Sequence, residues 1–239
     1  MKYAIISDVH ANLEAVTACF GEIDRIKPDR IICLGDLVDY CAEPNEVIDI
    51  IRSRCDIVIL GNHDEGQYDH SIISEFRQFA KLSSIHTRSI LNSEHLEYLR
   101  SLPRLHTENN ILFVHASPKY LPGYKYVLDT DAAFENFSSF SESVCFIGHS
   151  HRPVIFRQSE DYVEKINTDS IEKEGKYIIN VGSVGQPRDG NPKLAFGVFD
   201  NEMFKYQQVR IDYDIKIASE KILKSSLPAY LAERLFDGI

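Results

Sequence analysis

The chain has 239 residues, of which 44% are hydrophobic and 26% charged, an ordinary composition for a globular protein with a sizeable core. Its formal net charge of −10 argues against non-specific binding to nucleic acid or to an anionic membrane, because phosphate groups attract basic surfaces. The N-terminus enters an apolar segment without a signal-like region, and no apolar run has the roughly 18 residues of a membrane span. We therefore expect a cytoplasmic protein built as one domain over residues 1–239.

The five cysteines are odd in number, form no CxxC pair, and in three cases lie within or beside apolar runs. We expect small buried hydrophobic residues in a reducing compartment, rather than zinc ligands or reactive thiols. They are Cys19, Cys33, Cys41, Cys55 and Cys145.

The opening part of the chain alternates between strand and helix patterns. Asn12 is a suitable N-cap for a helix that ends before Pro28, and Pro44 opens a second helix. Strands joined by a helix are normally parallel and the crossover right-handed, so a parallel sheet is expected. Its three strands are predicted at Lys2–Ser7, Arg30–Leu34 and Asp56–Leu60.

From about Glu65 to Leu102 the pattern is helical and more polar than the preceding segments. We expect this region to form a helical insertion between the third strand and the next. Ser93 is the expected N-cap of its last helix, and Pro103 ends that helix. The buried face of this helix is predicted to hold Leu96, Leu99 and Leu102.

The rest of the chain has more strands than helices. The spacing of Phe134, Phe137 and Phe140 predicts one short helix, and a later helix is expected at Tyr213–Ser225. Strands alternate with helices in the first part of the chain, and strands follow one another in the later part. This order predicts an α/β (α+β) architecture of two packed mixed β-sheets with helices outside. The further strands are expected at Ile111–His115, Ser143–Ile147, Val154–Arg157, Tyr177–Val181, Leu194–Phe199 and Phe204–Val209.

Polar side chains follow five of these predicted strands at the point where each ends, which is where open α/β sheets hold ligands. Carboxylate, amide and imidazole groups bind hard and borderline divalent metals, and the absence of thiolate disfavours a cysteine-based zinc site. The set is too large for one ion and predicts two ions that share a carboxylate. Its members are Asp8, His10, Asp36, Asn62, His115, His149 and His151.

Each strand end taken alone has a simpler interpretation. An Asp such as Asp8 is commonly a cap or turn residue, and a single His such as His115 commonly packs or faces solvent. His149 and His151 alternate, so on an extended strand they would face the same way. Five coincidences together are not credible, so we prefer the metal hypothesis. Four histidines that follow no predicted strand receive no role: His70, His86, His95 and His106.

Five motifs follow one another along the chain: Asp8-x-His10, Gly35-Asp36-x-x-Asp39, Gly61-Asn62-His63-Asp64, a strand-ending His115 and Gly148-His149-x-His151. In this order they resemble the calcineurin-like metallophosphoesterase superfamily, in its compact bacterial and archaeal branch of phosphatases and phosphodiesterases. The resemblance implies an αββα sandwich and a metal-dependent phosphoric ester hydrolase. The run Asn180–Arg188 also resembles a loop of that branch, some of whose members cleave dinucleoside polyphosphates.

The family pattern implies two ligand groups that share Asp36. His63 would meet the leaving-group oxygen, as general acid or as a charge stabiliser, with Asp39 orienting its ring. A hydroxide that bridges the metals would attack in line. The implied cofactors are two divalent ions, Mn, Fe, Zn, Ni or Co, with availability deciding which. Besides Asp36, one ion would be held by Asp8, His10 and His151, and the other by Asn62, His115 and His149.

The chain departs from the protein Ser/Thr phosphatases of the superfamily, which carry a phosphate-clamping Arg after the residue matching Asp39. Tyr40 stands in that place, and Arg188 is the candidate replacement for substrate binding. The alternative is that Arg188 lies in solvent or pairs with Asp189. The tyrosines of the 120–126 loop either stack on a nucleobase or simply pack the loop: Tyr120, Tyr124 and Tyr126.

Three functions follow from these patterns. The first is a two-metal phosphoesterase acting on a small soluble ester, with nucleotides and dinucleoside polyphosphates among the candidates. The second, a phosphodiesterase of nucleic acid, is disfavoured by the acidic charge. The third, a catalytically silent binding module that keeps the fold, is disfavoured because every motif position is present. The sequence leaves open the substrate, monoester or diester preference, the metals and the oligomeric state.

Overall fold

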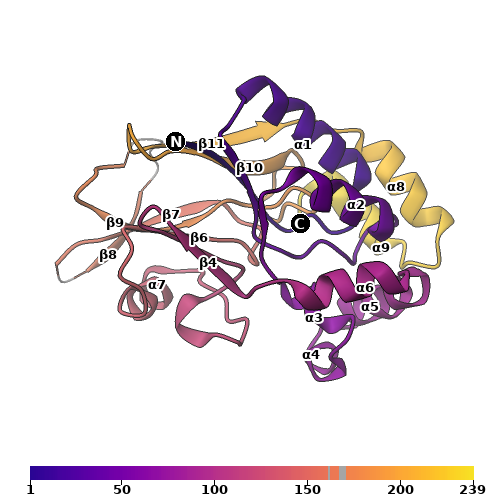
Figure 1. Ribbon diagram of the computed structural model, residues 1–239. Coiled ribbons are helices and arrows are strands. Elements are labelled where there is room, and N and C mark those ends of the chain that lie inside the picture. Colours follow the sequence, from indigo (N-terminus) through magenta and orange to yellow (C-terminus); the bar gives the residue numbers. More distant parts are fainter. Residues whose placement is uncertain (161, 167–170) are drawn as a thin grey trace.

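Two mixed β-sheets pack face to face in the computed structural model, which describes residues 1–160, 162–166 and 171–239 (Figure 1). One sheet contains, in spatial order, β11 (Lys205–Ile211), β10 (Leu194–Asp200), β1 (Lys2–Ile6), β2 (Arg30–Cys33) and β3 (Ile57–Val58). The other contains β4 (Leu105–Glu108), β5 (Ile111–Val114), β6 (Val144–Ile147), β9 (Lys176–Asn180), β7 (Val154–Gln158) and β8 (Val163–Ile166).

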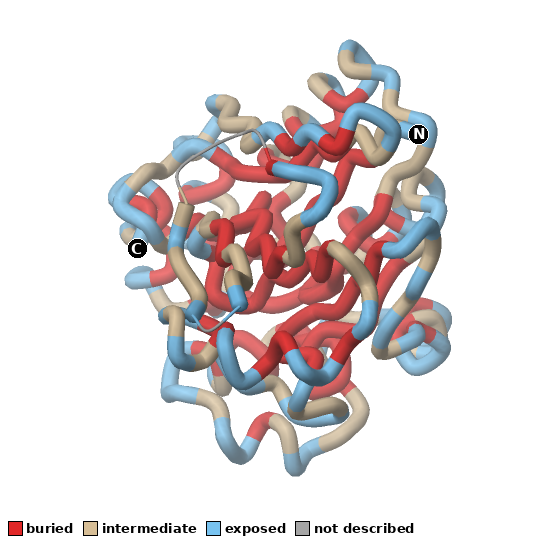
Figure 2. The backbone as a smooth tube through the Cα atoms, turned by 90° about the vertical axis from the view of Figure 1, so that its left-hand side faces the viewer, coloured by how far each residue is buried: buried red, intermediate tan, exposed pale blue. Residues whose placement is uncertain are grey.

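Alternation of side chains along the strands builds the layers. In β1, Tyr3 and Ile5 point into the core between the sheets, and Ala4 and Ile6 point to the opposite face. The β6 strand behaves in the same way, since Phe146 joins the core between the sheets. Both faces of the central strands are therefore buried, which explains why they are apolar throughout (Figure 2).

Helices cover the outer faces of both sheets. On the first sheet, α1 (Leu13–Ile26) and α2 (Pro44–Arg54) pack against the outward side chains of β1 and β2. On the second, α7 (Thr130–Phe137) packs against β5 and β6. The remaining helical segments are α3 (Asn62–Gly66), α4 (His70–Ser74), α5 (Gln78–Ile90), α6 (Ser93–Ser101), η1 (Pro118–Tyr120), α8 (Ile215–Lys224) and α9 (Tyr230–Asp237).

The structure confirms the predicted layers and corrects several details. Asn92, not Ser93, caps α6, because its side-chain oxygen accepts the His95 N–H at 2.7 Å. The helix α7 ends at Phe137, so Phe140 lies beyond it. Its buried face runs through Ala133 and Phe137, and the side chain of Phe134 is exposed. His106 lies within a strand, β4, that the sequence did not predict. The strand β8 and the helix α9 were also not predicted.

Four of the five cysteines are buried, as expected, and Cys55 is half-buried. All five are free thiols. Burial raises the pKa of each thiol well above its usual range, which keeps it protonated and unreactive. Of the helices in the described part of the chain, none has the length and apolar character to cross a membrane.

Candidate metal centre

The strand ends that carry the predicted ligands lie at one edge of the two sheets. The strands β1, β2 and β3 run parallel, and so do β5, β6 and β9. Their carboxyl ends therefore point in the same direction within each sheet. The segment after β1 is tied to the one after β2, since the Asp8 N–H donates to the Gly35 carbonyl at 3.0 Å and the His10 N–H to the Asp36 carbonyl at 2.9 Å.

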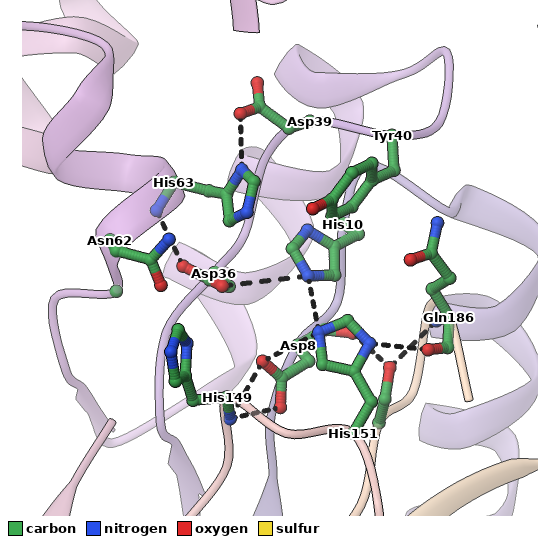
Figure 3. A network of polar contacts seen from close by, with 12 residues as sticks. Asp8, His10, Asp36, Asp39, Tyr40, Asn62, His63, His149, His151 and Gln186 are labelled. Carbon is green, nitrogen blue, oxygen red and sulfur yellow. Dashed lines mark hydrogen bonds and ion pairs between the residues drawn. The ribbon is translucent and has the colours of Figure 1, made fainter. Parts of the chain in front are cut away.

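Two groups of buried ligand atoms meet at this edge and share Asp36 (Figure 3). Within each group, the ligand atoms lie within 4.8 Å of one another. Asn62 adjoins the second group, with its side-chain oxygen 3.2 Å from His115 Nε2. The structure thus brings together every side chain that the sequence predicted as a ligand. The first group is Asp8, His10, Asp36 and His151, and the second is Asp36, His115 and His149.

Hydrogen bonds fix which nitrogen of each ring can bind a metal. The Nδ1–H of His10 donates to the Val38 carbonyl at 2.8 Å, and that of His151 donates to the Gln186 carbonyl at 2.5 Å. Each Nε2 therefore carries a lone pair, and the two Nε2 atoms lie only 3.2 Å apart. Burial lowers the pKa of both rings well below its usual value, so a proton does not relieve this repulsion. Facing lone pairs of this kind fit a shared cation.

The second group has the same need for positive charge. His115 Nδ1–H donates to the Leu34 carbonyl at 2.8 Å, so Nε2 faces the Asp36 carboxylate at 3.2 Å. Burial lowers the pKa of His115, but the attraction of Asp36 outweighs it and raises the pKa to about 9. A proton on Nε2 would thus occupy the place that a cation fits. In His149 the Nε2 atom is buried and has no hydrogen-bond partner among the described residues.

The carboxylates respond to their surroundings in opposite directions. Burial raises the pKa of Asp8 to about 7, because the low dielectric disfavours its charge. Burial also opposes ionisation of Asp36, but His115 and His63 hold its pKa well below the usual value. Divalent cations in the two groups would favour the ionised form of both carboxylates.

The backbone around these side chains is bent into an uncommon conformation. Positive φ angles occur at Asp8 (52°), His10 (49°), Asp36 (55°), His149 (64°) and His151 (59°). For residues other than glycine the left-handed region costs free energy, so the surrounding structure must impose it. Glycine is required where the chains approach: a Cβ on Gly148 would lie 1.9 Å from Ser7 Oγ and 2.6 Å from Asp8 Oδ2.

His63 lies beside the two groups and belongs to neither of them. Its ring is 5.0 Å from that of His10, and its Nδ1 is 2.6 Å from Asp39 Oδ2. Burial lowers the pKa of His63, but Asp36 and the hydrogen bond that the ring donates to Asp39 together raise it above the usual value. The ring is therefore suited to hold a proton. Sequence reasoning missed Gln67, whose amide donates to Asp39 Oδ1 at 3.0 Å and fixes that carboxylate.

Asp64 is a second residue whose role the sequence did not reveal. Its carboxylate accepts three backbone N–H groups, from Asp36 at 2.8 Å, Leu37 at 2.8 Å and Gly61 at 3.1 Å. These bonds tie the loop after β2 to the loop after β3 and so place the shared carboxylate of Asp36. The available signal was its position directly after Asn62 and His63 in the same run.

We expect Asp64→Ala to lower the free energy of unfolding by at least about 3 kcal/mol, because three buried donors lose their acceptor. For a chain of this size that corresponds to a melting temperature lower by roughly 6–12 °C. Calorimetry of the wild type and the variant measures the change. Asp69→Ala is the matched control, since Asp69 caps only the five-residue helix α4, and its effect should be much smaller. Equal shifts in the two variants would contradict the role assigned to Asp64.

The loop Gly182–Arg188 packs on the end of β1, as the Gly185 N–H donates to the Asp8 carbonyl at 2.9 Å. At the end of this loop the Arg188 guanidinium lies over the Tyr40 ring, 5.4 Å from its centroid. Tyr40 in turn packs edge-on against His10 at 4.6 Å. Asp189 pairs with Arg210 instead, so the alternative that Arg188 pairs with Asp189 is wrong.

The three loop tyrosines have separate positions. Tyr120 bonds to Glu135 at 2.7 Å, on the surface, and Tyr124 bonds to the buried Glu65 at 2.7 Å. Tyr126 stacks on His149 with ring centroids 4.1 Å apart, and half of it is exposed. Of the three, Tyr126 offers an exposed aromatic surface directly beside the candidate centre. Tyr120 and Tyr124 are held by acidic partners.

Comparison with known proteins gives concordant results. A model of the calcineurin-like phosphoesterase superfamily domain matches residues 1–202. An uncharacterized protein of Methanocaldococcus jannaschii is 38% identical over 241 residues, covering 98% of this chain and 97% of the relative. The solved structure of a metallophosphoesterase from Sphaerobacter thermophilus is similar, with a TM-score of 0.87 and 34% identity. The match covers 100% of this chain and 99% of the chain of that protein. A hypothetical protein from Pyrococcus horikoshii shares the fold, with a TM-score of 0.82, 21% identity and coverage of 100% and 98%.

Proposed function

The chain belongs to the calcineurin-like phosphoesterase superfamily, and on that basis we propose that it hydrolyses a small soluble phosphate ester with the help of two divalent metal ions. The observation that carries the proposal is the sharing of Asp36 by two buried ligand groups. Two facing imidazole lone pairs in the first group support a cation there, because burial keeps both rings unprotonated.

In this proposal, the first ion is held by Asp8, His10, Asp36 and His151, and the second by Asp36, Asn62, His115 and His149. Bound there, divalent cations supply Lewis-acid chemistry, which polarises phosphoryl oxygens and promotes ionisation of water near neutral pH. Manganese, iron, zinc, nickel and cobalt all suit this set of oxygen and nitrogen donors.

The other side chains complete the chemistry. His63 holds a proton for the leaving-group oxygen, because Asp39 faces its Nδ1 and fixes the ring. Arg188 contacts the phosphoryl group, which it can do because Gln186 and Tyr40, rather than a carboxylate, surround its guanidinium. Tyr126 is placed to pack against the organic part of the ester.

The test compares hydrolysis of p-nitrophenyl phosphate and bis-p-nitrophenyl phosphate by purified protein supplied with Mn²⁺. We expect turnover of at least one ester, abolished by a chelator and restored by added metal. Preference for the diester indicates a phosphodiesterase, and preference for the monoester indicates a phosphatase.

Metal analysis of the same sample decides the meaning of a negative result. Two ions per chain without turnover would point to a narrower substrate, such as a dinucleoside polyphosphate, as the next ester to assay. Absence of bound metal after loading would overturn the proposal and favour a binding module that keeps only the fold.

A further inference from the structure

Two tyrosine rings from the loop before α7 lie against the histidines of the second ligand group. The Tyr126 ring stacks on His149, with the centroids 4.1 Å apart and the planes 20° from parallel. The Tyr124 ring meets His115 edge-on, with centroids 5.9 Å apart, and its centroid is 6.3 Å from that of His149. One segment of the chain therefore supplies an aromatic border to this side of the candidate centre.

Polar contacts hold the Tyr124 part of this segment in place. The Tyr124 hydroxyl donates to the buried Glu65 carboxylate at 2.7 Å, and the Arg104 guanidinium pairs with both oxygens of the same carboxylate. Arg104 Nη1 also donates to the Pro122 carbonyl at 3.4 Å. Glu65 belongs to α3, the short helix that begins directly after β3. The loop is thus fastened to the body of the protein immediately before Tyr126.

The residue after Tyr126 is fastened as well, since Val127 is 3% exposed and packs in the core under α7. Tyr126 itself remains 50% exposed between these two anchors. Within the described part of the chain its hydroxyl has no hydrogen-bond partner. Its exposure is therefore not the result of a loose loop. The fold holds a large aromatic ring in a fixed place with part of its surface open.

Such a ring is prepared to bind a ligand. A side chain that is already positioned loses little conformational entropy when a ligand contacts it. His149 covers one face of the Tyr126 ring, so the open surface lies one ring away from a predicted metal ligand. A group attached to a phosphate at the centre could reach that surface. Planar aromatic groups gain from such contacts beyond the burial of apolar area, and every nucleobase has a face that can stack on tyrosine.

We propose that Tyr126 is a specificity-determining residue, whose ring stacks on a nucleobase in the organic part of the ester. The inference rests on the proposed function for the position of the scissile phosphate, and it adds the chemical class of the group that the phosphate carries. Stacking favours nucleotides over alkyl and sugar phosphates without selecting one base.

The test uses a fluorescent nucleotide analogue, 2-aminopurine riboside 5′-methylenephosphonate, in which a methylene group replaces the ester oxygen and prevents hydrolysis. The fluorescence of 2-aminopurine falls when the base stacks on another aromatic ring, so quenching reports the proposed contact without turnover. The probe is titrated with the metal-loaded full chain. We expect saturable binding with quenching by the wild type.

Two substitutions remove the aromatic ring. Tyr126→Ala should bind the probe about 5- to 150-fold more weakly, the usual effect of deleting a residue on which a base stacks. Tyr126→Leu still covers His149 with apolar atoms, so its affinity should fall by only about two- to twelvefold, and its quenching should be largely lost.

Two further variants serve as controls. Tyr126→Phe should keep the affinity and the quenching of the wild type, because it keeps the ring and loses a hydroxyl without a partner among the described residues. Tyr162→Leu removes a ring of similar exposure, 57%, from the turn between β7 and β8, and as the matched control it should behave like the wild type.

Inorganic phosphate, which has no organic part, separates stacking from mere support of His149. It should displace the probe from the wild type and from Tyr126→Leu with the same affinity. A phosphate affinity that falls in Tyr126→Leu as much as the probe affinity would show that the ring only supports the histidine, and would overturn the proposal.

The remaining outcomes distinguish this proposal from the proposed hydrolase. Equal affinity and equal quenching in the wild type and Tyr126→Leu would overturn the stacking role and leave the hydrolase standing. A wild type that binds phosphate but not the probe would do the same. Quenching that depends on Tyr126, in a protein that hydrolyses no ester, would support the stacking role and count against the hydrolase.

Discussion

Asp36→Asn should lose most of its bound metal and at least about a thousandfold of its phosphoesterase activity, because Asp36 is the carboxylate that both ligand groups share. Its Oδ2 lies 3.2 Å from His115 Nε2 and 3.7 Å from His10 Nε2, so one carboxylate would serve two ions. Asparagine has nearly the same shape but no charge, and one neutral oxygen cannot offset two divalent cations. Mass spectrometry for metals, together with steady-state kinetics, measures both losses.

The fold should survive this substitution. Asparagine can still accept the backbone N–H of His63, which now donates to Asp36 Oδ1 at 2.9 Å. Asp212→Asn is the matched control, since Asp212 is exposed, pairs with Lys193 and belongs to neither ligand group. Metal content in Asp36→Asn equal to that of the control would refute the shared position of Asp36.

The sequence made the ligands predictable because each comes directly after an apolar strand, and parallel strands bring their ends together. Asp36 and His151 could be selected in this way without any knowledge of their contacts. Gln67 could not, because it lies on a polar stretch after His63 and acts through Asp39.

The fold was predictable for a similar reason. Segments with both faces buried, such as β1 and β6, have continuous apolar runs, which single-sequence patterns detect. The strand β4, with the sequence Leu-His-Thr-Glu, is the edge strand beside β5 and lacks such a run. Propensity alone did not identify it, because tertiary pairing rather than local pattern makes this segment a strand.

His63→Asn should keep the metal content of the wild type and lower the rate by about a hundredfold to ten-thousandfold, the usual contribution of a general acid. The ring of His63 belongs to neither ligand group, and only its backbone N–H reaches Asp36. Asp39→Asn should have a smaller effect of the same kind, because the ring remains and only its charged partner is removed.

The choice of leaving group distinguishes proton donation from a merely structural effect. Nitrophenolate departs readily without a proton, whereas an alkoxide does not, so the loss in His63→Asn should be larger for an alkyl phosphate than for p-nitrophenyl phosphate. A structural defect would lower both rates by the same factor. Since Asp39 and Asp36 raise the pKa of His63, the ring can carry its proton near neutral pH, and a loss independent of the leaving group would show that the proton is not used.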